Sequence, residues 1–173
     1  MSLLRPTTIL IAALLLTTTA GIARATDVSM ASGSVHFSTP DTWLGIMQTD
    51  GDPEIRVFQV PDPSPSGSAT LARVTVTVKQ VNGADGFQAY VNSATTRAKS
   101  LPGYQPSSQA SSAANSFTYT ANESGTPFEY VEHYWLKNGS AIQLRCVRPA
   151  QSEAGPAWKA SFDKGCNAIA ATL

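Results

Sequence analysis

The chain has 173 residues, of which 12 are basic and 12 are acidic, and charged side chains make up only 14% of it. A chain this close to neutral lacks the basic surface that binds nucleic acids or anionic membranes, so we expect neither as a partner. Its length suits one domain large enough to bury a core.

The first 25 residues have the three parts of a secretory signal peptide. Arg5 provides a positive start, an apolar run covers residues 9–16, and small residues lead to Ala23-Arg24-Ala25. The run is shorter than the roughly 20 residues that span a bilayer, which disfavours the alternative of an uncleaved membrane anchor. We therefore predict cleavage after Ala25 and a single periplasmic or secreted domain over residues 26–173, with no membrane span.

The first half of this domain reads as short strands separated by turns. Alternating apolar residues predict strands over residues 34–39, 44–48, 55–60 and 70–81, with Val74, Val76 and Val78 giving the clearest alternation. Residues 61–68 contain three prolines, three serines and a glycine. This composition predicts an exposed loop.

The period then changes to that of a helix. Asp85 is a plausible N-cap, and apolar residues three and four apart predict a helix through about Ser100, where Leu101-Pro102-Gly103 ends it. Further strands are expected over residues 104–110, 117–121, 128–136 and 141–147, followed by a helix over residues 157–172.

The Asn138-Gly139 pair between the last two predicted strands is the strongest local signal for a hairpin. Consecutive hairpins imply pairing between antiparallel strands. The order of strands, helix, strands and helix therefore predicts an α+β fold, in which helices flank a mostly antiparallel sheet.

Two cysteines occur, Cys146 and Cys166. Cys146 follows Ile142 on the inward side of a predicted strand, and Cys166 lies on one apolar stripe of the last helix with Phe162 and Ile169. An even number of cysteines in an exported chain favours a disulfide, so we predict a Cys146–Cys166 bridge. A reactive thiol pair is the alternative, which the absence of a C-x-x-C motif disfavours.

Few residues are candidates for chemistry. His36 lies between two apolar residues of a predicted strand and is expected to face solvent. Glu129 and His133 share one face of their predicted strand, while Glu132 faces the other. Two ligands make a poor zinc site, which needs three or four protein ligands, so a charged pair on an exposed face is the favoured interpretation.

Catalytic motifs are also missing from the sequence. No nucleophile elbow, glycine-rich phosphate loop or evident carboxylate pair occurs. Asp50, Asp52 and Glu54 lack the spacing of a calcium loop and fit ordinary turn chemistry. We expect no catalytic residue, no metal, no cofactor and no enzymatic activity.

The aromatic residues are the remaining functional clue. Tyr134 and Trp135 are adjacent on a predicted strand, so one must point to each face of the sheet. An exposed tyrosine or tryptophan is a good anchor for a protein interface. We take Trp43, Tyr130, Tyr134 and Trp135, with the loop over residues 61–68, as candidate binding residues. The alternative is that a helix covers the second face.

The pattern also resembles a known superfamily. The features that carry the resemblance are Phe37, the Pro40-x-x-Trp43 turn, the valine strand, the helix after Asp85, the aromatic hairpin and the last helix with Trp158. By these features the chain resembles PsbP-like proteins, and periplasmic DcrB-like members most of all. The resemblance implies an α/β/α sandwich used as a non-catalytic binding or accessory module. It supplies no catalytic residues, and the two cysteines belong to none of its motifs.

These observations favour an exported accessory protein that binds another protein in the envelope. One alternative is a periplasmic immunity protein or inhibitor that neutralises a secreted toxin or hydrolase. Another is an envelope enzyme or metal-binding protein that uses Glu129 and His133.

Overall fold

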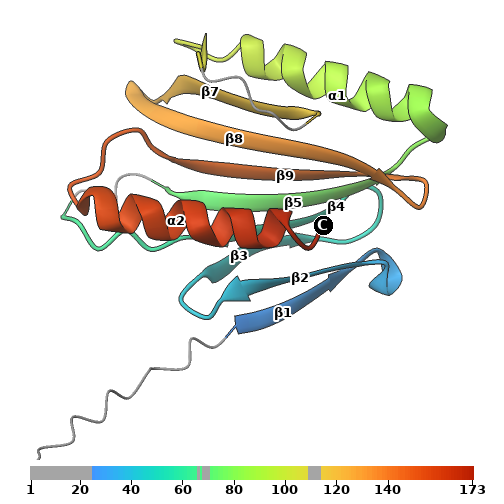
Figure 1. Ribbon diagram of the computed structural model, residues 1–173, viewed down its shortest axis with the longest axis horizontal. Coiled ribbons are helices and arrows are strands. Elements are labelled where there is room, and N and C mark those ends of the chain that lie inside the picture. The colour runs from blue at the N-terminus through green and yellow to red at the C-terminus, as the bar shows by residue number, and fades with distance from the viewer. Residues whose placement is uncertain (1–24, 66, 68–70, 109–113) are drawn as a thin grey trace, which may run out of the picture.

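The computed structural model describes residues 25–65, 67, 71–108 and 114–173. These residues form nine strands, two α-helices and one short 3-10 helix (Figure 1). The strands are β1 (Ala25–Met30), β2 (Val35–Pro40), β3 (Leu44–Thr49), β4 (Glu54–Gln59), β5 (Arg73–Gln80), β6 (Gln105–Pro106), β7 (Ser116–Glu123), β8 (Thr126–Lys137) and β9 (Ser140–Pro149). The helices are α1 (Gly83–Lys99) and α2 (Gly155–Ala170), and the 3-10 helix η1 covers Ala31–Gly33.

Seven strands form one antiparallel sheet in the order β3-β4-β5-β9-β8-β7-β6. The last strand, β9, therefore lies in the centre, between β5 and β8. Strands β1 and β2 form a separate antiparallel hairpin beside the β3 end of the sheet (Figure 1). This architecture confirms the predicted α+β class.

One face of the sheet packs against α2 and the hairpin. Valines at alternate positions of β5 lie opposite Ile142, Leu144 and Cys146 of β9 and are fully or almost fully buried. Phe58 of β4 continues this layer and meets Phe37 of the hairpin edge to face, with ring centroids 6.0 Å apart. The alternation in β5 thus marks the face that builds the largest part of the core.

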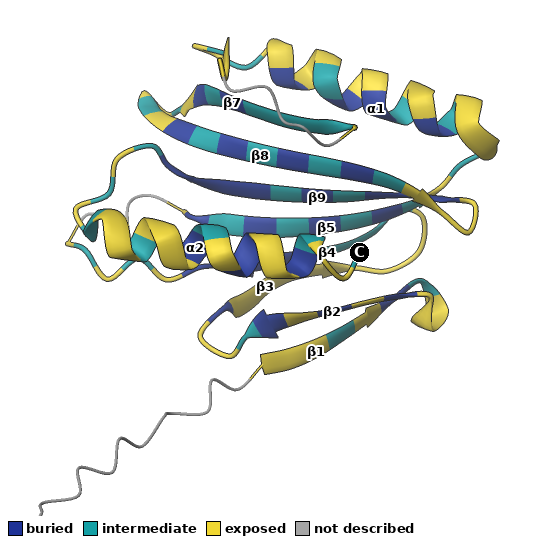
Figure 2. Ribbon diagram, in the orientation of Figure 1, coloured by how far each residue is buried: buried dark blue, intermediate teal, exposed yellow. Residues whose placement is uncertain are grey.

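Helix α1 covers the opposite face, over β7, β8 and β9. Its apolar stripe of Phe87, Val91, Ala94 and Ala98 is buried and visible as the dark side of the helix in Figure 2. Tyrosines of β7 and β8 form the layer beneath it. The two helices therefore pack on opposite faces.

The predicted Cys146–Cys166 disulfide is present, with 6.3 Å between the two Cα atoms. It joins the central strand β9 to α2. Both cysteines are buried, because the inward face of the strand and the apolar stripe of the helix meet at this point. The bridge links residues 20 positions apart and fastens α2 to the sheet.

Three details differ from the sequence prediction. Asn82, not Asp85, is the N-cap of α1, because its carbonyl accepts the first hydrogen bond of the helix, from the N–H of Gly86 at 3.2 Å. Gly83 has a positive φ of 65°, which glycine tolerates, and Asp85 lies in the first turn. The strand expected over residues 104–110 shrinks to β6, and residues 109 and 110 lie outside the described part. Strand β1 was not predicted, since only Val28 and Met30 of it alternate toward the core.

The predicted signal segment falls mainly on residues 1–24, outside the described residues, so its cleavage stays a prediction. Ala25, the last residue of that segment, pairs with Pro40 at the start of β1. Within the described ranges, neither helix has the length and apolarity needed to span a membrane.

Candidate functional site

Most of the aromatic residues expected to anchor a partner are buried, which corrects that expectation. Tyr130 and Tyr134 point toward α1, whose apolar stripe covers them. Trp43 lies against α2, stacked on Phe162 with ring centroids 6.3 Å apart. It approaches α2 so closely that a Cβ at Gly165 would lie 2.5 Å from its Cζ2 atom. These three side chains therefore stabilise the core and are not available to a partner.

Trp135 points to the other face and is half-buried. Its ring stacks on His133, with centroids 5.7 Å apart, and packs against the core layer under α2. The predicted loop is described only in part. Within it, the carbonyl of Pro61 accepts a hydrogen bond of 2.9 Å from Nε1 of Trp158, and Asp62 accepts one of 2.7 Å from Ser152. The described part of the loop is thus fastened to the start of α2.

Glu129 and His133 share a face as predicted, but the structure does not bring them together as a site. Four positions along a strand separate them by about 13 Å. Glu129 forms ion pairs with Arg148 at 3.0 Å and with Lys159 of α2 at 3.6 Å. Burial lowers the pKa of His133. Among the described residues, no group of three or more histidine, cysteine, aspartate or glutamate side chains is placed to hold a metal. His36 is exposed, as predicted.

Glu132 is the polar residue that the sequence prediction undervalued. It is buried beneath α1 on the tyrosine face of β8. Tyr119 donates a hydrogen bond of 2.8 Å to its Oε1 atom and Tyr134 donates one to Oε2. Arg145 forms an ion pair with Oε1 at 2.9 Å, and Gln143 donates to Oε2 at 3.4 Å.

The donors around Glu132 stay protonated at neutral pH. Burial is the main cause that raises the pKa of both Tyr119 and Tyr134 far above the ordinary value, and the carboxylate adds to it. Two hollows of about 270 and 260 Å³ on either side of α1 reach this carboxylate. Because four side chains already occupy its oxygens, Glu132 joins β7, β8 and β9 and has little capacity left to act as a base.

Strand β3, at one edge of the sheet, is exposed along its whole length. All six of its residues are exposed, and Figure 2 shows it exposed where the central strands are buried. Among the described residues it pairs only with β4, so its outer side leaves backbone donors and acceptors unpaired. Leu44, Ile46 and Met47 are 53%, 46% and 49% exposed, although strands usually hide such side chains. A shift in register between Gly45 and Met47 marks a β-bulge.

A groove of about 520 Å³ separates this open edge from the hairpin. We call it the β1–β3 groove; Asp27, Val28 and Ser29 of β1 line one side, and residues 45–48 of β3 line the other. Arg56, Val57 and Phe58 of β4 complete the lining. Apolar side chains and a few polar groups thus lie beside an unpaired strand edge, which is the surface that an extended segment of another chain can occupy.

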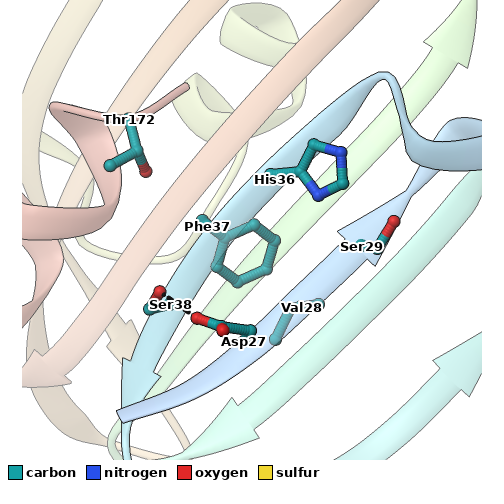
Figure 3. A pocket seen from close by; sticks show the side chains of 7 residues that line it. All are labelled: Asp27, Val28, Ser29, His36, Phe37, Ser38 and Thr172. Atoms are coloured by element: carbon teal, nitrogen blue, oxygen red, sulfur yellow. Dashed lines mark hydrogen bonds between the residues drawn. The ribbon is translucent and has the colours of Figure 1, made fainter.

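A second hollow, of about 590 Å³, lies on the other side of β1. Its lining side chains include Asp27, Ser29, His36 and Ser38 of the hairpin (Figure 3). Ser38 donates a hydrogen bond of 2.7 Å to Asp27. Among the described side chains, no hydrogen bond joins His36 to a carboxylate, so the arrangement shows no catalytic triad.

Two solved structures share this fold. PA94 from Pseudomonas aeruginosa, a protein of unknown function described as a candidate regulator, matches with a TM-score of 0.51 and 16% identity over 86% of this chain and 95% of that chain. LpqN, involved in cell envelope biogenesis of Mycobacterium tuberculosis, matches with a TM-score of 0.50 and 15% identity over 86% of this chain and 88% of that chain. At such identities the likeness establishes the α+β fold alone.

No protein-family model matches the sequence, and no curated protein does so either. Membership of the PsbP-like superfamily is therefore not shown by these comparisons.

Proposed function

We propose that this chain is an exported, non-catalytic envelope protein that acts by binding another protein, and that the open edge of β3 makes the contact. The observation that carries the proposal is the exposure of every residue of β3, including Leu44, Ile46 and Met47. Proteins usually protect such an edge with charges or bulges, or cover it, because it pairs readily with other strands; β3 has the bulge between Gly45 and Met47 but no charge. An apolar, uncharged and accessible edge therefore fits a binding surface.

Three further observations support the proposal. The signal-like start of the sequence and the Cys146–Cys166 bridge suit an oxidising compartment outside the cytoplasm. LpqN, which shares the fold, is involved in cell envelope biogenesis. The polar groups also argue against catalysis, since Glu132 is fully engaged and Glu129 and His133 lie apart.

The proposal includes membership of the PsbP-like superfamily. An antiparallel sheet with a helix on each face agrees with what the Phe37 and Pro40-x-x-Trp43 pattern implies. A non-catalytic accessory role is the use that this superfamily makes of the fold. The assignment supports protein binding in general and leaves the identity of the partner to experiment.

The test is capture of partners by matched variants. Three forms of the tagged protein over residues 26–173 are compared: the wild type, Ile46→Lys and Leu136→Lys. Each is exposed to envelope extract of the organism that produces the protein. Leu136 is 41% exposed and lies away from β3, so it controls for adding a lysine to an exposed apolar site. We expect Ile46→Lys to weaken capture of a stoichiometric partner at least tenfold, with little change in stability at so exposed a position.

Equal capture by wild type and Ile46→Lys would exclude β3 as the contact. Absence of any stoichiometric partner would exclude the protein-binding function itself. A captured toxin or hydrolase would make this chain the inhibitor that the sequence leaves open as an alternative.

A further inference from the structure

We infer that the segment that binds β3 is an extended stretch of a different protein, apolar at its centre and basic at its ends. The inference rests on the proposed function and adds the chemistry of the partner. It follows from three features of the edge: its unpaired backbone, its uncharged side chains, and the carboxylates that lie at both of its ends.

The unpaired backbone requires an extended partner. Among protein segments, an extended strand is the one that can replace water on all the outward donors and acceptors of β3 together. The six residues of β3 contain no ionisable side chain, and Leu44, Ile46 and Met47 present apolar surface. The β1–β3 groove beside them contributes Val28 and Phe58. The centre of the bound segment therefore has to be uncharged and apolar.

Carboxylates outnumber cations where β3 ends. Asp50 follows directly on Thr49 and is 73% exposed; it forms an ion pair with Arg56 at 3.0 Å. The same guanidinium also binds Glu54, at 2.8 Å. Asp52 accepts a hydrogen bond of 2.9 Å from the backbone N–H of Gln80, and its ion pair with Lys79 is longer, at 3.8 Å. Three carboxylates thus share two cations at this end of the strand.

Two carboxylates also lie at the other end, where the predicted cleavage after Ala25 would leave one α-ammonium group, at Thr26. Asp41 precedes Leu44 by three positions and accepts a hydrogen bond of 2.9 Å from the hydroxyl of Thr26. Asp27, which lines the β1–β3 groove, accepts from Ser38. In the part of the chain that the structure describes, neither carboxylate has an ion pair with a cation. Lysine or arginine at the ends of a bound segment would meet these charges within the screening length of about 8 Å.

The same charges disfavour a second copy of this chain as the partner. Antiparallel pairing of two β3 strands would place Asp41 of one copy near Asp50 and Asp52 of the other. Parallel pairing would place like residues beside each other. Carboxylates face carboxylates in both arrangements, and such juxtaposition costs binding free energy. A heterologous segment with basic ends avoids this repulsion.

The experiment is photo-crosslinking in the producing cells. The full chain carries benzoylphenylalanine in place of Ile46, or in place of Leu136 as the matched control, and the crosslinked peptides of the partner are sequenced. We expect adducts with another protein at position 46 and none at position 136. The crosslinked partner segment should be apolar and carry lysine or arginine within about three positions on each side, the reach of a six-residue strand.

A second set of variants tests the charges. With the crosslinker at position 46, Asp41→Lys/Asp50→Lys should reduce adduct formation at least tenfold, and the milder Asp41→Asn/Asp50→Asn should reduce it less. Asp85→Lys in α1 is the control for a charge change elsewhere and should leave it unchanged. Thermal unfolding of each purified variant confirms that it is folded.

The outcomes separate the inference from the proposed function. A partner segment without basic ends, or adducts indifferent to the reversal of Asp41 and Asp50, would overturn the inference and leave protein binding at β3 standing. An adduct with residues 44–49 of a second copy would overturn the inference in favour of self-association. Absence of any adduct at position 46 would overturn both.

Discussion

The Cys146–Cys166 bridge allows a quantitative test of how α2 is held on the sheet. Reducing the bridge keeps both buried thiols in place, so side-chain packing changes little. The main change is in the unfolded chain, which gains freedom when a loop spanning 20 positions opens. The chain-entropy relation gives about 3 kcal/mol for that loop length. In a protein of this size such a loss lowers the melting temperature by about 6–12 °C.

The assay is equilibrium unfolding in urea, followed by tryptophan fluorescence, with and without a reductant. The double variant Cys146→Ala/Cys166→Ala is the control, and the reductant should not affect it. Because both cysteines are buried, this variant also loses packing and should be less stable than the reduced wild type. A reductant effect on the wild type below about 1 kcal/mol would refute the reasoning, since the bridge would then not restrain the unfolded chain.

Three more predictions concern polar groups that are buried or half-buried. Glu132→Ala should lower the unfolding free energy by about 3 kcal/mol or more, because it removes the carboxylate that Arg145 and two tyrosine hydroxyls contact. Glu129→Ala should lower it less. Urea unfolding of both variants measures the difference. Burial lowers the pKa of His133, so below about pH 6.5 the unfolded chain binds a proton more readily than the folded chain does. Acid should therefore destabilise the wild type more than His133→Gln. Equal acid sensitivity of the two proteins in melting curves would contradict this. Burial raises the pKa of Tyr90 to about 12, so the unfolding free energy should fall as the pH rises above about 10. Tyr90→Phe should reduce that fall. If the unfolding free energy of this variant falls with pH as steeply as that of the wild type between about pH 10 and 12, the prediction is wrong.

Local patterns explain which elements could be predicted. The alternation of Val74, Val76 and Val78 predicted β5 because a strand with one buried face needs an apolar residue at every second position. The Asn138-Gly139 turn predicted the β8–β9 hairpin because both residues adopt positive φ, which few other residue pairs tolerate. These signals act within a few residues and do not depend on what packs against them.

The candidate site depended on contacts that no local pattern records. Alternation correctly placed Glu132 on the face opposite Glu129 and His133, but its partners Tyr119 and Gln143 come from neighbouring strands. In the same way, adjacency showed that Tyr134 and Trp135 point to opposite faces without showing which face a helix covers. Burial of Tyr134 under α1 was therefore beyond the reach of the sequence.

By itself, the sequence determined most of the strand and helix segments, though not β1 or the short β6, together with the α+β class and the pairing of the two cysteines. It did so because hydrophobic period, turn chemistry and inward-facing positions are properties of short stretches of chain. Only the tertiary structure decided that β9 occupies the centre of the sheet and that β3 lies uncovered at its edge. The physical reason is that strand order follows from pairing between residues far apart in sequence, and an edge becomes a binding surface only when no other part of the fold covers it.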